Sequence, residues 1–177
     1  MPDVLRTIPA SSRDLEGVAS AIAEFKAYWE TIRPRPPFPC SFEGTQQDID
    51  ALDYFDYEGL PYPPSGIAGA ALIWGNVTTR QAGFRWHLDE YGDLLLCPPG
   101  EPSLAIWPYA RVVEIQHGAR PQFGKYKWLM EQVIVECLGL ATMDRADEAR
   151  LIGMIEGLTE DGYARGLEAA LRRYQDV

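Results

Sequence analysis

The chain contains two histidines, and one of them stands beside two carboxylates. His87 is followed by Asp89 at two residues and by Glu90 at three. Alternate residues of a strand share a face, and a carboxylate beside an imidazole can orient it or share a metal ion with it. His117 follows the next strand-like segment and could add a third ligand. These residues support one hypothesis, a small metal-dependent hydrolase that uses His87, Asp89 and His117, with Glu90 as a further candidate.

Other catalytic arrangements lack support in the sequence. The Gly-x-Ser-x-Gly nucleophile motif is absent, and no glycine-rich phosphate loop follows a predicted strand. Cys40, Cys97 and Cys137 have neither C-x-x-C spacing nor a histidine at zinc-finger distance, so we interpret them as buried free thiols. We therefore expect no cofactor and no resident metal, and the sequence favours a non-enzymatic protein.

Residues 41–58 form an acidic window that contains six Asp or Glu residues and no Lys or Arg. In its second half, aromatic residues are interspersed among acidic ones. Aromatic side chains provide a large contact area, and clustered carboxylates attract a basic partner. The window lacks the loop spacing of a calcium site, and a solvated helix face remains the alternative. The predicted contact residues are Asp53, Tyr54, Phe55, Asp56, Tyr57 and Glu58.

The whole chain is acidic, with 26 Asp and Glu against 16 Lys and Arg and a formal net charge of −10. Nucleic acids and anionic membranes bind to clustered basic side chains, so we expect neither as a partner. No apolar run approaches the ~20 residues of a membrane-spanning helix, and the first residues do not resemble a secretory signal. We expect a cytoplasmic protein that binds a basic protein partner.

Hydrophobic periodicity and breaks at proline and glycine predict the elements that position these residues. Helices are expected over residues 11–32, 41–58, 65–79, 122–139, 145–157 and 160–175. Short strands are expected over 83–88, 94–97 and 104–107, whereas 111–116 could be a strand or a short helix. The 177 residues are therefore expected to form a single α+β domain in which a small antiparallel β-meander, over about 83–115, packs against N-terminal and C-terminal helices.

Three packing motifs follow one another in the middle of the chain. Ala71-Leu-Ile-Trp-Gly lies in a helix of small residues, Gly83-Phe-Arg-Trp begins a strand, and Trp107-Pro closes the meander. Over residues 65–117 this series resembles small bacterial α+β domains of the kind found among toxin-immunity proteins. The resemblance implies an inhibitor that binds a toxin, and it assigns no catalytic residue.

The sequence leaves three hypotheses open. The first is an immunity-type inhibitor that binds a basic toxin through the acidic window. The second is the metal-dependent hydrolase described above. The third is a structural subunit that docks a neighbour in an apolar groove. An exposed pair among the five tryptophans would favour this third hypothesis, although a shared aromatic core is the usual role of such residues.

Overall fold

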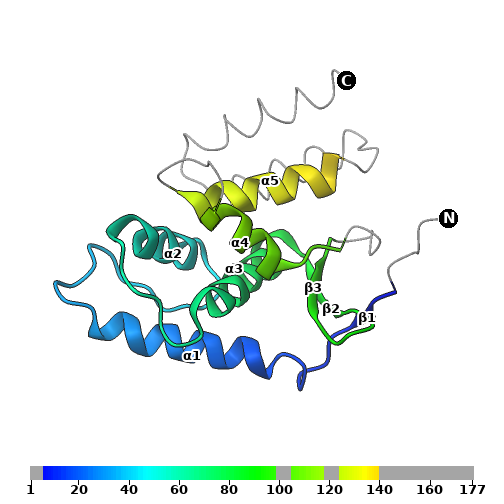
Figure 1. Cartoon of the computed structure of the whole chain (residues 1–177), viewed down its shortest axis with the longest axis horizontal. Coiled ribbons are helices and arrows are strands. Elements are labelled where there is room, and N and C mark those ends of the chain that lie inside the picture. Colours follow the sequence, from blue (N-terminus) through cyan, green and yellow to red (C-terminus); the bar gives the residue numbers. More distant parts are fainter. Residues whose placement is uncertain (1–5, 99–104, 118–123, 140–177) are drawn as a thin grey trace.

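The computed structural model describes residues 6–98, 105–117 and 124–139 (Figure 1). They form helices and a small antiparallel sheet, which confirms the α+β class. None of these helices has the length and apolar content needed to cross a membrane. The helices predicted over 145–157 and 160–175 lie outside the described residues. The elements are β1 (Ile8–Pro9), α1 (Glu16–Thr31), α2 (Gln46–Glu58), α3 (Gly66–Ala82), β2 (Arg85–Leu88), β3 (Leu94–Cys97), α4 (Pro108–His117) and α5 (Lys125–Gly139).

Helix α3 lies at the centre of the molecule and contacts α1, α2, α4 and α5 (Figure 1). Its fully buried side chains include Ile73, Trp74 and Val77. Gly75 lies against the sheet, where a Cβ atom would overlap the ring of Trp86 on β2. Glycine therefore allows the helix and the sheet to approach closely.

An apolar stripe on α1 faces the core. Phe25 and Trp29 are buried, and their rings lie 5.8 Å and 5.7 Å from the ring of Phe55 on α2. Aromatic pairs at these centroid separations are attractive beyond the area that they bury. The same aromatic cluster therefore holds α1 against α2. The stripe residues on α1 and just beyond its ends are Leu15, Val18, Ile22, Phe25, Trp29 and Ile32.

Helix α2 confirms the predicted acid-rich helix, but it begins at Gln46 rather than near residue 41. Phe42 and Gly44 have φ angles of 53° and 80°, which a right-handed helix does not accommodate. At Gly44 a Cβ atom would also collide with the side chain of Arg80. The segment before α2 is therefore a tight turn packed beneath α3.

The sheet has the strand order β1-β2-β3, and both pairings are antiparallel. Its third strand is β1, where Ile8 pairs with Leu88, rather than the predicted strand over 104–107. Within the latter segment, Ile106 forms only an isolated bridge with Leu96, with both N···O distances at 2.8 Å. Pairing ends there because Pro108 begins helix α4.

The ambiguous segment 111–116 is helical and belongs to α4. Pro108, Val112 and Ile115 are buried along this helix, at steps of four and three residues. This spacing is typical of a helix that packs one face against a core. The structure places that face on α3 and α5.

Candidate functional site

His87 lies on β2, next to the edge strand β1. Its Nδ1 atom lies 3.0 Å from the Thr7 hydroxyl, and its backbone pairs with Pro9 and Leu95. A ring nitrogen that is engaged by a hydroxyl fixes the orientation of the imidazole. The hydrogen-bond partner of His87 in the structure is therefore a threonine and not the predicted carboxylate.

Asp89 and Glu90 lie in the turn between β2 and β3. One carboxylate oxygen of Asp89 accepts hydrogen bonds from the backbone N–H groups of Tyr91 and Asp93, at 2.8 Å and 2.9 Å. This is the usual way in which an aspartate stabilises a turn. Glu90 is exposed beside Tyr91, whose pKa it raises by charge repulsion. The structure thus gives Asp89 a conformational role in the hairpin.

His117 is exposed at the last residue of α4 and lines a surface groove on that helix. Across the part of the chain that the structure describes, no three His, Cys, Asp or Glu side chains gather where they could hold a metal ion. The three ligands expected of the hydrolase therefore do not form such a group there.

Three of the six acidic side chains in the window, Asp48, Asp53 and Asp56, form contacts inside the fold. Asp53 accepts hydrogen bonds from the backbone N–H groups of Tyr126 and Lys127, at 2.8 Å and 3.3 Å. Asp56 forms an ion pair with Lys125 at 3.2 Å. Both carboxylates thus hold the first turn of α5 against α2. The N–H groups in the first turn of a helix have no acceptor within that helix, and Asp53 supplies one for two of them.

Burial changes the protonation of this cluster. It raises the pKa of Asp53 to about 7, against the opposing effect of the two backbone N–H groups. Asp48 is buried at the other end of α2 and accepts a hydrogen bond from the Gly44 N–H at 2.7 Å. Burial raises its pKa as well. These two aspartates stabilise the fold from inside, so they offer little charge to a partner.

The aromatic residues of the window are divided between the core and the surface. Phe55 is 0% exposed, so its predicted role as an exposed anchor is wrong: it packs inside the aromatic cluster. Tyr54 is half-buried, with its ring 5.8 Å from that of Trp29. Tyr57, which is 59% exposed, and Glu58 remain at the surface. Only the C-terminal end of the predicted contact surface is therefore accessible.

A second aromatic surface lies on α4 and was missed by sequence reasoning. Trp107 and Tyr109 are 47% and 43% exposed, and their ring centroids lie 5.9 Å apart. They line a groove of about 530 Å³ with Ala110 and Val113, and Glu114 and His117 complete the lining. The available signal was a second apolar face: Tyr109, Ala110 and Val113 lie at helical spacing on the side opposite Val112 and Ile115.

The other tryptophans do not add to this surface. Trp29, Trp74 and Trp86 are buried, and Trp128 is half-buried. The exposed aromatic pair thus consists of one tryptophan and one tyrosine. Comparisons of the chain with protein-family models, curated proteins and solved structures give no match.

Proposed function

We propose that this chain is a non-enzymatic protein-binding domain that docks a basic protein on the α4 groove. The observation that supports the proposal most directly is the exposed pair of Trp107 and Tyr109. Tryptophan and tyrosine are enriched among the residues that contribute most to binding energy at protein interfaces. Two such side chains over an apolar groove are therefore suited to anchor a partner.

Two features of the groove favour a basic partner. The faces of Trp107 and Tyr109 attract Lys or Arg side chains through cation–π contacts. Glu114 lies in the lining, and its side chain is 58% exposed even though it pairs with Arg111 at 3.5 Å. An exposed ion pair of this kind contributes little to stability, so a cation of the partner can take the place of Arg111 beside Glu114.

The charge of the chain supports the same choice at longer range. A net charge of −10 increases the encounter rate with a positively charged protein, and salt screens this effect. Inhibition of a basic toxin by covering its functional surface is the form of binding that the resemblance implies. We therefore propose that the basic partner is a toxin and that this chain inhibits it by covering that surface.

The proposal can be tested by affinity capture from the native host, using the wild-type chain, the double variant W107A/Y109A and the control Y91A. Tyr91 is 82% exposed on the β2–β3 turn and lies outside the groove. We expect wild type and Y91A to capture the same basic protein, and W107A/Y109A to lose it. Circular dichroism should show that all three chains are folded.

Two results would contradict the proposal. One is capture that the double variant retains, or that yields only acidic proteins. The other is a concentration-dependent dimer of the purified chain that W107A/Y109A abolishes, because this would assign the groove to a second copy. Sedimentation of the wild-type chain and the double variant distinguishes these cases.

A further inference from the structure

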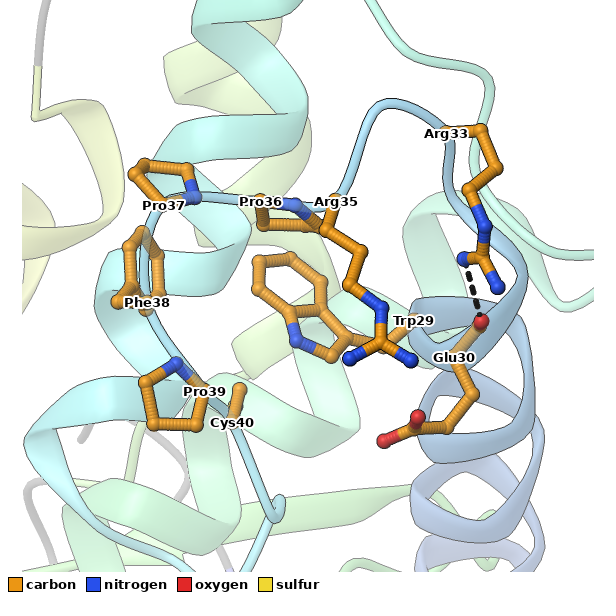
Figure 2. Close-up of a pocket in the computed structure, with 9 residues that line it drawn as sticks. All are labelled: Trp29, Glu30, Arg33, Arg35, Pro36, Pro37, Phe38, Pro39 and Cys40. Carbon is orange, nitrogen blue, oxygen red and sulfur yellow. Dashed lines mark hydrogen bonds between the residues drawn. The ribbon is translucent and has the colours of Figure 1, made fainter.

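A second cavity, of about 300 Å³, lies where α1 ends and the proline-rich connector 33–39 begins (Figure 2). This volume is at the lower end of the range for small-molecule sites. Its walls combine apolar surface with positive charge. Trp29, Phe38 and three prolines of the connector provide the apolar surface, and Arg33 and Arg35 provide the guanidinium groups.

The two arginines are placed differently. Arg33 donates from Nη1 to the backbone carbonyls of Glu30 and Ile32, at 2.9 Å and 2.8 Å, which fixes its guanidinium at the rim (Figure 2). Arg35 makes no hydrogen bond or ion pair with any residue in the described ranges.

Trp29 adds an unused donor to the same cavity. Its side chain is packed at 5.4 Å from the ring of Phe38 and is only 4% exposed. Figure 2 shows the indole nitrogen on the ring edge that faces Cys40. Among the described residues this N–H has no hydrogen-bond acceptor, although it is not one of the buried polar atoms that lack a partner, which are Thr45 Oγ1 and Trp74 Nε1. An indole N–H can only donate, so an acceptor on a ligand in the cavity can pair with it.

The remaining polar groups leave the cavity with an excess of positive charge. Burial raises the pKa of the Cys40 thiol to about 12, so this wall is neutral at physiological pH. The thiol donates to a carboxylate oxygen of Asp48, which lies behind it at 3.5 Å. Among the described residues that line the cavity, Glu30 supplies the single carboxylate, against the two guanidinium groups.

We propose that this cavity binds a small organic carboxylate with a flat apolar body. Arg35 and Arg33 pair with the carboxylate, because the guanidinium fork matches its two oxygens. The apolar body lies against Trp29, Phe38 and the prolines, whose rigid rings require little ordering when the ligand binds. This site is separate from the α4 groove and does not depend on its function.

Benzoate is a suitable probe, with acetate and inorganic phosphate as comparisons. NMR titration of the ¹⁵N-labelled full chain should show saturable, millimolar binding of benzoate that shifts the Trp29 indole N–H signal. The W29F variant identifies that signal among the five tryptophans. Acetate should bind more weakly because it lacks the apolar body. No saturation by benzoate, or tighter binding of phosphate than of benzoate, would overturn the proposal.

Variants of the charged residues separate a specific site from general attraction. Loss of a charge-assisted hydrogen bond in R35Q should weaken benzoate binding about tenfold. E30Q should strengthen it about twofold by removing a repelling charge. R85Q is the matched control, since Arg85 is exposed on β2 outside the cavity. Equal effects of R35Q and R85Q would overturn the proposal, and the folded spectrum of each variant excludes unfolding as the cause.

Discussion

The carboxylate of Asp53 on α2 accepts a hydrogen bond from the backbone N–H of Tyr126 on α5, across 73 residues of sequence. The backbone N–H groups in the first turn of a helix usually donate to the side chain of the helix's own N-cap residue. Here Gly124, which has no side chain acceptor, precedes α5, and an aspartate from another helix supplies the oxygen. The acidic window is thus part of the connection between α2 and α5.

Replacement of Asp53 by alanine should lower the free energy of unfolding by about 1–3 kcal/mol, because two backbone N–H groups lose their acceptor. D53N should cost less, since an amide oxygen can still accept one of these bonds. D50A is the matched control, because Asp50 lies on the same helix and, among the described residues, accepts only from Gln46, at 3.3 Å. Urea unfolding of the three variants measures the differences, and equal losses for D53A and D50A would contradict this assignment.

Asp53 should also make stability depend on pH. Its folded pKa, about 7, lies above the value of 3.8 expected in the unfolded chain. Between these values the folded state holds the proton that the unfolded state has lost, so the free energy of unfolding falls as pH rises. The slope for one proton is at most about 1.4 kcal/mol per pH unit.

The difference in unfolding free energy between wild type and D53N isolates this contribution. It should decrease from about pH 4 to pH 7 and then level off as Asp53 becomes ionised in both states. E131Q should remove a similar part of the slope, because burial raises the pKa of Glu131 to about 7 as well. A difference that increases with pH would show that Asp53 is already ionised in the fold at low pH.

Substitution of Gly75 by alanine should destabilise the chain by about 1–3 kcal/mol, because the added Cβ overlaps the ring of Trp86. Gly17 is the control: it is exposed on α1 with no atom within 4 Å of an added Cβ. G17A should be stabilising by about 0.5–1 kcal/mol, since alanine has the higher helix propensity. Thermal unfolding compares the two, and a neutral G75A would contradict the close approach of α3 and β2.

Local patterns predicted the elements whose boundaries depend on local chemistry. Helix α1 carries its apolar residues at helical spacing, and the prolines after Arg33 prevent its continuation. The hairpin of β2 and β3 is bounded by Gly83 and turns at Gly92, both of which have positive φ. In these cases neighbouring residues carry most of the information that decides the structure.

Pairings between distant residues could not be predicted in this way. Strand β1 contains only Ile8 and Pro9, and it is a strand because its backbone meets β2. The acidic window likewise resembled an open charged surface because the N–H groups that bind Asp53 lie far along the chain. The charge of a segment does not reveal which carboxylates will be buried. For this reason the sequence predicted the whole acidic window as a contact surface.

Photo-crosslinking in the native host tests the central claim, that a basic partner docks on α4, most directly. A photoreactive phenylalanine analogue is placed at Tyr109 in one chain and at Tyr57 in another. Both tyrosines are exposed, the first in the α4 groove and the second at the accessible end of the acidic window. We predict that the analogue at position 109 crosslinks to one basic protein and that the analogue at position 57 does not. Crosslinking of that protein from position 57 alone, or from neither position, would contradict the assignment of the α4 groove.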